Sequence, residues 1–464
     1  MITSNLKPYP DYMDTGVDWL GKVPKHWELR RTKSLLVQRS EKGYPNEPLL
    51  AATQTKGVVR KEKYENRTVL ALKDLELLKI VRVGDFVISL RSFQGGIEFA
   101  REQGIISPAY TILCPRVPDH HAYLARVFKS RPYIENLSLF VTGIRQGQNI
   151  DYESLARSYL PLPPVPEQSA IVRFLDHADR RIQRYIRAKQ KLIALLEEQK
   201  QAIIHQAVTG QIDVRTGQPY PAYEASVVEW LGDVPEHWQF LRLKDVAQVQ
   251  TGLTLGKDYR STQTISRPYL RVANVQAGCL DLSQVKSIDV PRDEAARAAL
   301  LPGDVLMTEG GDIDKLGRGC VWRDEIPGCL HQNHIFAVRC RRGLLSPEFL
   351  VGLMGSIHGR AYFEFTAKKT TNLASTNSNT LRKFPVLLPI LEEQLTILKA
   401  ISEKTSGLEK AIERTNREIA LVQEYRTRLI ADVVTGKLDV REAAAELPEE
   451  DESTNKYSCE QLVT

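Results

Sequence analysis

Two polar loops of this chain carry the side-chain types that bind phosphates and the edges of nucleic-acid bases. Arginine and lysine neutralise phosphates, whereas glutamine, asparagine and threonine can hydrogen-bond to base edges. Solvated surface loops use the same residue types, so that alternative stays open. The candidate contact residues in these two loops are Arg145, Gln146, Gln148, Asn149, Lys368, Lys369, Thr370 and Asn372.

Further candidates lie in loops that adjoin apolar strands. Residues 81–90 and 301–308 each read as a Gly-Asp turn that leads into a buried strand, and a polar, glycine-containing loop follows each of them. Such loops tolerate insertions and tend to carry binding residues. The candidates in this group are Arg91, Ser92, Gln94, Lys315, Arg318 and Asn333.

The sequence carries no recognisable catalytic motif, and none for a methyltransferase or a helicase. The glycine-rich stretch 310–319 lacks GxxxxGK[ST] spacing and a following helix pattern, so we interpret it as a loop between strands. Cysteines and histidines gather at 320–340 without zinc-knuckle spacing, and the first half repeats only Cys114, opposite Cys340. We therefore predict no catalytic residue, no cofactor and no metal ligand in this chain.

A long helix is predicted from Val165 to Val208, after two prolines and before Thr209-Gly210. Its apolar residues recur at steps of three, four and seven, which is typical of a helix that packs lengthwise against another. At about 1.5 Å per residue it would be roughly 60 Å long. This pattern also places Tyr185, Leu192 and Leu196 on the apolar seam.

A second helix with the same apolar phase lies about 226 residues later and ends at Val434-Thr435-Gly436. Two helices with seams in one phase most simply bury those seams against each other. The predicted seam residues are Ile171, Leu175, Ile182, Ile186, Ile193, Ile203, Ile397, Ile401, Leu408, Ile412, Ile419 and Leu429.

The segment before each helix is duplicated too. Residues 18–27 and 229–238 share the pattern Trp-Leu-Gly-Xaa-Val-Pro-Xaa-His-Trp, in the same order as the two helices, which indicates an internal repeat. Large aromatic side chains around such a turn are expected in a core, with base stacking as the alternative. The tryptophans concerned are Trp19, Trp27, Trp230 and Trp238.

The predicted fold class is α+β: two similar strand-rich domains with short helices, separated by two long helices that pack lengthwise against each other. The internal repeat makes this arrangement pseudo-twofold. The predicted boundaries are 1–162 for the first domain, 163–212 for the first helix, 213–387 for the second domain, 388–438 for the second helix and 439–464 for an acidic, disordered tail.

The composition indicates that residues 1–441 are basic and that the protein is cytoplasmic. The net charge is +6, but seven acidic residues and one lysine follow residue 441, so residues 1–441 carry about +12. A basic body suits a polyanionic partner. No apolar run approaches a membrane span, no signal peptide is evident, and the six cysteines lack CxxC spacing. We expect a cytoplasmic protein without a membrane partner.

Together these repeated motifs resemble the specificity subunit of type I restriction–modification enzymes, over about residues 9–441. The resemblance implies that the two long helices pack as an antiparallel coiled coil. It implies two target-recognition domains, each reading half of a bipartite, asymmetric site on double-stranded DNA. It also implies that the helices set the spacing and dock two modification subunits, which methylate adenine with S-adenosylmethionine. Restriction subunits would use ATP and magnesium, and all catalysis would lie in these partners.

Two alternatives stay open at this point. The chain could be a coiled-coil scaffold that holds protein partners without reading DNA, or an enzyme with an unrecognised nuclease site. Basic loops at matching positions in both halves favour DNA reading over scaffolding.

Overall fold

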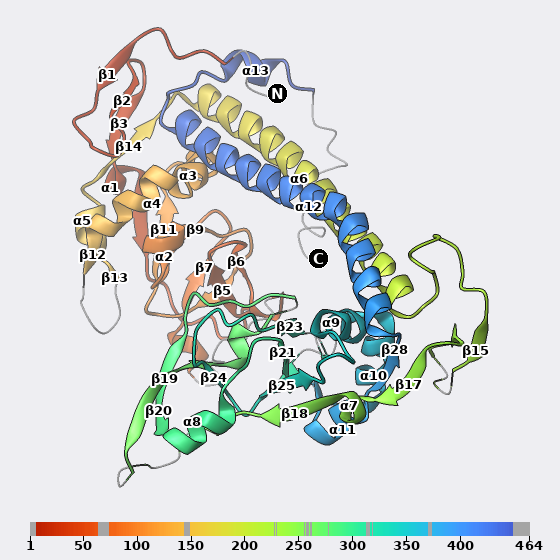
Figure 1. Cartoon of the computed structure of the whole chain (residues 1–464). Helices are drawn as coiled ribbons and strands as arrows, with labels where there is room; N and C mark the ends of the chain where they lie inside the picture. The colour runs from red at the N-terminus through yellow and green to blue at the C-terminus, as the bar shows by residue number, and fades with distance from the viewer. Residues whose placement is uncertain are drawn as a thin grey trace. The chain divides into compact units, whose positions relative to one another are not determined.

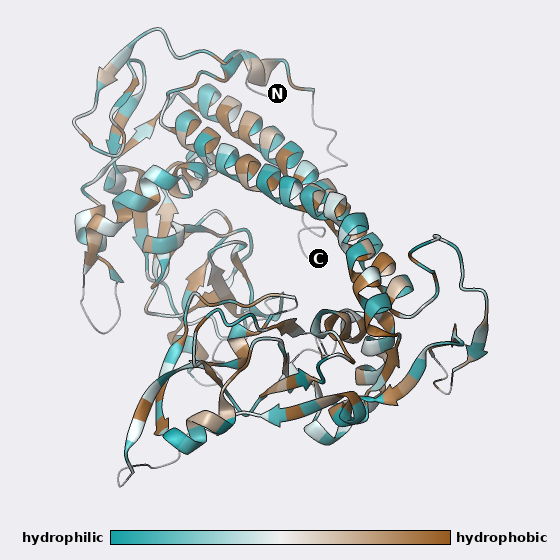
Figure 2. Cartoon of the chain, in the orientation of Figure 1, coloured by the Kyte–Doolittle hydropathy of each residue, from teal (hydrophilic) through white to brown (hydrophobic). Residues whose placement is uncertain are grey.

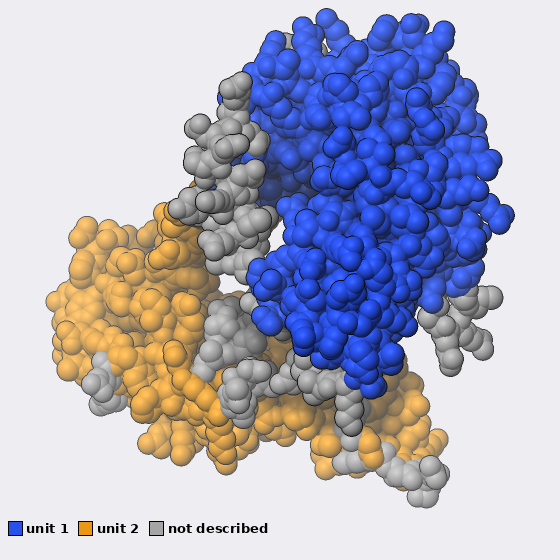
Figure 3. Space-filling view, turned by 180° about the vertical axis from the view of Figure 1, so that it is seen from behind, with its two compact units in different colours: residues 1–189, 417–464 blue, residues 190–416 orange. Residues whose placement is uncertain are grey.

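The computed structural model describes residues 6–63, 74–142, 149–226, 228, 230–254, 256, 259, 262–276, 278–311, 316–317, 319–369 and 374–448. The chain forms two compact units (Figure 3), one of residues 1–189 with 417–464 and one of residues 190–416. The predicted linear division into domains and helices differs from this arrangement, because each long helix is shared between the two units.

A four-stranded antiparallel sheet with the same strand order lies in each unit. Figure 1 labels all the strands of the sheet in the second unit. In the first unit the order β4-β11-β8-β9 joins Leu36–Arg39, Thr111–Pro115, Phe86–Ile88 and Glu98–Phe99. In the second unit the order β18-β25-β21-β23 joins Ala247–Thr251, Ile335–Cys340, Asp304–Thr308 and Gly319–Val321. The predicted internal repeat is thus visible as a repeated sheet topology.

Matching short elements surround the two sheets. The first unit also holds β1 and β2 (Tyr12–Asp14, Lys22–Pro24), β3 and β14 (Glu28–Arg31, Tyr159–Leu162), β5 and β6 (Leu50–Thr53, Gly57–Arg60), β7 and β10 (Lys79–Val81, Gly104–Ile106), β12 and β13 (Val141–Thr142, Asn149–Ile150), and the helices α1 to α5 (Thr32–Leu35, Ser92–Gly95, His121–Phe128, Arg131–Leu137, Tyr152–Leu155). Each pair of strands forms an antiparallel ladder.

The second unit repeats this plan with insertions. It holds β15 and β16 (Tyr223–Ala225, Asp233–Pro235), β17 and β28 (Gln239–Arg242, Pro385–Leu388), the sheet β20-β19-β24 (Lys286–Pro291, Thr264–Leu270, Leu330–His331), the sheet β22-β27-β26 (Gly310–Gly311, Ala374–Ser375, Lys368–Lys369) and the helices α7 to α11 (Leu243–Val246, Arg292–Ala298, Pro347–Gly355, Ile357–Thr366, Ser378–Arg382). The buried side chains of each unit are mainly leucine, isoleucine, valine and phenylalanine.

The two long helices are α6 (Val165–Val208) and α12 (Leu391–Val434). In the first unit an ion pair joins Asp179 to Arg426, and Lys189 Nζ lies 2.7 Å from Glu418 Oε2. Residue numbers rise along one helix as they fall along the other, so the pair is antiparallel. In Figure 2 hydrophilic and hydrophobic residues alternate along both helices, as an amphipathic pair requires. These observations confirm the predicted fold class.

The seam residues differ in burial. Tyr185 and Leu192 are 42% and 41% exposed, so they are not buried in the seam as predicted. The Tyr185 hydroxyl reaches the facing helix, where it donates to Glu418 Oε2 at 3.3 Å. The predicted seam residues that are buried are Ile171, Leu175, Ile182, Ile186, Ile397 and Leu429. The half-buried ones are Ile193, Ile203, Ile401, Leu408, Ile412 and Ile419.

Both helices end in the same way. Gly210 follows α6 with φ 73° and Gly436 follows α12 with φ 74°, a left-handed conformation that favours glycine. A Cβ at Gly210 would lie 2.5 Å from Pro235 Cδ, and one at Gly436 would lie 2.2 Å from Pro24 Cδ. Each glycine therefore ends its helix and also allows the Val-Pro turn of the repeated motif to approach closely.

The segment after α12 is part of the first unit. Val440 and Ala444 are 0% and 2% exposed, and α13 (Arg441–Ala445) is helical. This finding differs from the predicted start of an unstructured tail at residue 439. Residues 449–464 lie outside the described part of the chain. No helix among the described residues is long and apolar enough to cross a bilayer.

Candidate nucleic-acid interface

A three-stranded sheet joins two of the predicted polar loops in the second unit. β22 (Gly310–Gly311) and β26 (Lys368–Lys369) both pair with β27 (Ala374–Ser375). Both lysines are exposed. The fold therefore brings two loops that are far apart in the sequence onto one surface, which we call the β22-β27-β26 surface.

A third loop adjoins this surface through Glu309. The Glu309 amide donates to the His334 carbonyl at 2.9 Å, and the Thr376 amide donates to the Glu309 carbonyl at 2.8 Å. The His334 Nδ1 also lies 2.6 Å from Glu309 Oε2. The predicted residue Asn333 is half-buried beside it, and its amide donates to the Leu253 carbonyl at 2.9 Å. The loops thus form a mixed polar surface rather than a purely basic one.

Four predicted contact residues of the second unit fall outside the described part of the chain: Lys315, Arg318, Thr370 and Asn372.

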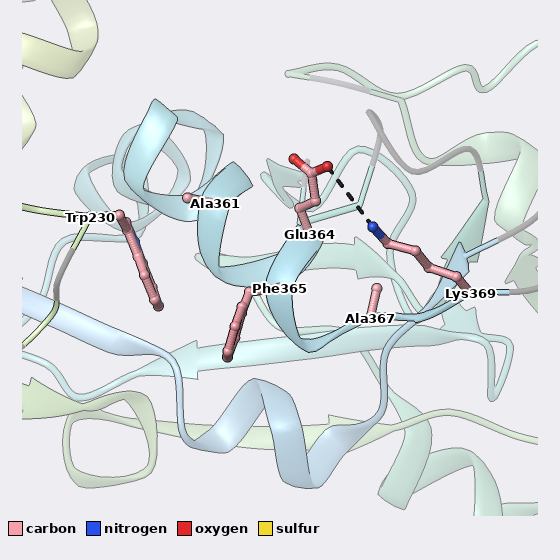
Figure 4. A pocket seen from close by; sticks show the side chains of 6 residues that line it. All are labelled: Trp230, Ala361, Glu364, Phe365, Ala367 and Lys369. Atoms are coloured by element: carbon pink, nitrogen blue, oxygen red, sulfur yellow. Dashed lines mark ion pairs between the residues drawn. The ribbon is translucent and has the colours of Figure 1, made fainter.

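An exposed aromatic pair, Trp230 and Phe365, lines the same pocket as Lys369 (Figure 4). The rings of Trp230 and Phe365 have centroids 5.9 Å apart, and the two residues are 41% and 79% exposed. Lys369 Nζ lies 4.0 Å from Glu364 Oε1 on the same pocket wall. Exposed aromatic faces next to a cation are suited to stacking on bases. The pair was missed in the sequence, because nothing there marks Phe365 as exposed.

The four tryptophans of the repeated motif differ in burial. Trp27 and Trp238 are 2% and 3% exposed, which confirms the predicted core role for these two. Trp19 is half-buried and its ring lies edge-on to Tyr133, with centroids 5.3 Å apart. The prediction that Trp230 lies in a core is wrong, because its ring is exposed beside Phe365. The same sequence motif therefore places tryptophans both in a core and on the surface.

In the first unit the loop after β8 exposes two of the three predicted residues. Arg91 and Gln94 are exposed. Ser92 is 1% exposed, and its hydroxyl accepts a hydrogen bond from the Ser89 amide at 2.8 Å. The prediction that Ser92 contacts a ligand is therefore wrong, because its hydroxyl holds the turn.

The second predicted loop of the first unit is described only in part. Asn149 is exposed on β13, which pairs with β12. Residues Arg145, Gln146 and Gln148 lie outside the described part of the chain.

A buried ion pair fixes the loop that carries Arg91 and Gln94. Glu98 on β9 is 1% exposed, and Lys129 donates to Glu98 Oε1 at 2.6 Å and to the Gly95 carbonyl at 2.7 Å. Burial raises the pKa of Glu98 to about 7, although the Lys129 ammonium acts in the opposite direction. Sequence analysis missed this pair, because a glutamate in a short strand reads as solvent-exposed.

The cysteine and histidine cluster of the second unit does not resemble a metal site. Cys320 and Cys329 are buried, and burial raises the pKa of both thiols to about 12. His331 is buried with its Nδ1 2.9 Å from the Ile335 carbonyl. Over the residues that the structure describes, no three His, Cys, Asp or Glu side chains are grouped to hold a metal ion.

The geometry defines a class of protein, a chain of two similar α+β units on an antiparallel helix pair. A chain from a structural study of assembly and conformational transition in a type I restriction–modification system shares this fold, with a TM-score of 0.56 and 15% identity. That match covers 90% of this chain and 99% of the other. No protein-family model matches the chain.

The curated relatives of the chain are described as specificity subunits. The chain is 23% identical over 207 residues to a Methanocaldococcus jannaschii chain described as the type I restriction enzyme MjaX specificity subunit. It is 22% identical over 330 residues to the Escherichia coli type I restriction enzyme EcoKI specificity subunit. The matches cover 44% and 70% of this chain, and they span 47% and 68% of those relatives.

Proposed function

We propose that this chain is the non-catalytic DNA-sequence specificity subunit of a type I restriction–modification complex. Each unit reads one half of a bipartite, asymmetric site, and the α6–α12 pair sets the spacing between the halves. The observation that carries the proposal is the repeated unit: the same sheet order occurs twice, each time followed by a long helix. Similarity to curated specificity subunits supports it.

The proposed partners are double-stranded DNA, two modification subunits docked on the helices, and restriction subunits. The modification subunits would use S-adenosylmethionine to methylate adenine, and the restriction subunits would use ATP and magnesium. The specificity subunit itself would hold no cofactor and would act in the cytoplasm, where its DNA substrate lies.

The surface chemistry favours DNA reading over a scaffold role. Lys368 and Lys369 are exposed on the β22-β27-β26 surface, and the aromatic pair of Trp230 and Phe365 lines one pocket with Lys369. Cations supply phosphate contacts, and aromatic and amide groups can contact bases. A scaffold requires the helix pair but has no use for such loops in both units.

Sequencing of methylated bases in the host, with and without this gene, tests the proposal directly. We expect one bipartite methylated motif to disappear when the gene is deleted and to return on complementation. A gel-shift assay should show sequence-specific binding only when modification subunits are added. An unchanged methylome would exclude the specificity role, and methylation or cleavage by the purified chain alone would exclude a non-catalytic one.

A further inference from the structure

Each long helix carries a buried glutamate in its first turn. Glu167 lies near the start of α6 and Glu393 near the start of α12, and they are 5% and 8% exposed. A buried carboxylate is costly unless both of its oxygens are satisfied. The hydrogen-bond partners of each buried carboxylate therefore indicate its structural role.

In the first unit three donors of the opening segment surround Glu167. The Tyr9 hydroxyl donates to Glu167 Oε1 at 2.6 Å, and the Trp27 Nε1–H donates to the same oxygen at 2.9 Å. His26 Nε2 lies 2.8 Å from Glu167 Oε2. Burial and the hydrogen bond to Glu167 raise the pKa of Tyr9 well above its usual range, so its hydroxyl stays a donor.

The second unit repeats this cluster with the same four residue types. The Tyr220 hydroxyl and the Trp238 Nε1–H donate to Glu393 Oε1 at 2.8 Å and 3.2 Å. His237 Nε2 lies 3.0 Å from Glu393 Oε2. The two units share the cluster although their polar loops differ. The cluster therefore has a role that does not depend on the sequence of the loops.

The end of the other helix completes each cluster. The Arg441 guanidinium lies 5.2 Å from the centre of the Tyr9 ring and pairs with Asp439, beyond the end of α12. The Arg215 guanidinium lies 6.0 Å from the Tyr220 ring and pairs with Asp213, beyond the end of α6. Each cluster thus gathers the start of one helix, the end of the other and the opening segment of a domain.

The cluster adds a polar attachment to the covalent and apolar attachments of each domain to its helix. β14 leads through Pro163-Pro164 into α6, and β28 leads through Pro389-Ile390 into α12. Phe174 of α6 shares one apolar core with Tyr123 of the first domain, and Ile397 of α12 shares one with Phe349 of the second. Apolar contact is non-directional, whereas the hydrogen bonds to the glutamate are directional, so the cluster fixes one orientation of the domain on the helix pair.

We propose that Glu167 and Glu393 are positioning residues that fix the orientation of each recognition domain on the helix pair, and so restrict the gap between the two half-sites. The inference rests on the proposed function. The glutamates need not touch DNA to act in this way, because they act through the domain they hold.

The test is Glu393→Ala in the complete complex, read out by sequencing methylated bases. The wild-type complex should methylate one motif with one gap length, and failure at this step would count against the proposed function rather than the inference. In the variant both half-site sequences should stay the same. Sites with a gap one base pair longer or shorter should become at least about tenfold more frequent, because the loss of a single charge-assisted hydrogen bond is worth about that factor and the variant removes the shared acceptor of Tyr220, Trp238 and His237.

Two further variants separate positioning from stability. Glu392→Ala removes an exposed charge from the same helix turn and should keep the single gap length. Glu393→Gln keeps an acceptor for Tyr220 and Trp238 and should restore most of the wild-type gap. A folded Glu393→Ala complex with an unchanged gap distribution would overturn the inference. If that variant does not assemble, Tyr220→Phe removes one donor and is judged by the same two outcomes.

Discussion

Single side chains of the two units fall into exposed groups that can reach a ligand and buried groups that hold the loops in place. Lys368, Lys369, Arg91 and Gln94 are of the first kind. Glu98 is of the second kind, because it is buried against Lys129 under its loop. Substitutions of the exposed side chains are therefore expected to change DNA binding, whereas a substitution of the buried glutamate is expected to change stability.

Replacing Lys368 and Lys369 by alanine should weaken DNA binding by a similar factor for all sequences. If each lysine contacts a phosphate, the slope of log affinity against log salt should become shallower by about two. Equilibrium binding at several salt concentrations measures both quantities. The matched control replaces Lys404 and Lys410, which are exposed on α12, and should leave the slope unchanged. An equal effect in both double variants would assign no special role to the β22-β27-β26 surface.

Glu98 should make stability fall with rising pH. Its pKa is about 7 in the folded chain and 4.5 as an ordinary glutamate, so the folded state binds more protons between these values. Stability is therefore full below about pH 4.5 and is lost as pH rises through about 7, by about 1.4 kcal/mol per pKa unit. Thermal unfolding should show a smaller pH dependence for Glu98→Gln. Glu135→Gln, at an exposed site, should behave like wild type, and identical pH profiles for all three proteins would contradict the assignment.

At the scale of elements, the ends of the long helices determine how the domains are attached. Gly210 and Gly436 each end a helix in a left-handed conformation, and each faces a Pro and a Trp of the repeated motif. Close approach and backbone conformation both require glycine at these positions, and a matched pair of substitutions separates the two requirements.

Gly210→Ala should destabilise the second unit more than Gly217→Ala. Both glycines have φ 73°, so both substitutions carry the left-handed cost of about 1 kcal/mol. A Cβ at Gly210 would also meet Pro235 at 2.5 Å, whereas one at Gly217 would meet nothing within 4 Å. Overpacking adds about 1–3 kcal/mol. Urea unfolding of the two variants measures the difference, and equal losses would show that the close approach is unimportant.

Lengthening both helices by four residues should widen the gap between half-sites. Insertions after Leu195 in α6 and after Glu413 in α12 add about 6 Å and rotate the remainder of each helix by roughly 40°. The apolar seams survive such an insertion with a local stutter. Base pairs rise about 3.4 Å, so we expect a gap longer by one or two base pairs and unchanged half-sites.

Insertions of two residues serve as the control, because they turn the seam by about 200° and should impair assembly. An active four-residue variant with its original gap would mean that the helices do not set the spacing.

The sequence predicted the elements better than their contacts. Periodicity located both long helices and placed Ile182 and Ile186 on the buried side, but it could not show that Tyr185 and Leu192, which are seven residues apart, remain partly exposed. The pairing of β22 with β27 could not be predicted either, because a two-residue ladder between distant segments leaves no periodic signal.

At the scale of the whole molecule, the first unit is built from both ends of the chain. Lys7 bridges to Asp439, and the Tyr12 hydroxyl donates to the Lys437 carbonyl at 3.4 Å. The opening segment therefore belongs with the C-terminal part of the chain as much as with the domain it precedes. An exchange of domains between relatives should therefore keep the opening segment and the C-terminal part of the first unit from the same protein.

Exchanging residues 28–160 for the equivalent segment of a relative should change one half of the methylated motif and leave the other intact. This segment begins in β3 and ends in β14, which pair with each other, so the exchange keeps both the Glu167 cluster and the Lys7–Asp439 bridge. Exchanging residues 1–160 instead should lower thermal stability as well, because it separates Tyr9 from its native partners. Simultaneous change of both half-sites would show that the units do not read independently.

The discontinuous first unit also dictates an order of events during synthesis. A growing chain usually folds its N-terminal domain first. Here residues 190–416 form one continuous unit, whereas residues 1–189 lack Val433, Val434 and Val440 of their core until the segment after residue 416 has been synthesised. Residues 1–189 are therefore made before residues 190–416 but can complete their core only after them, which reverses the usual order.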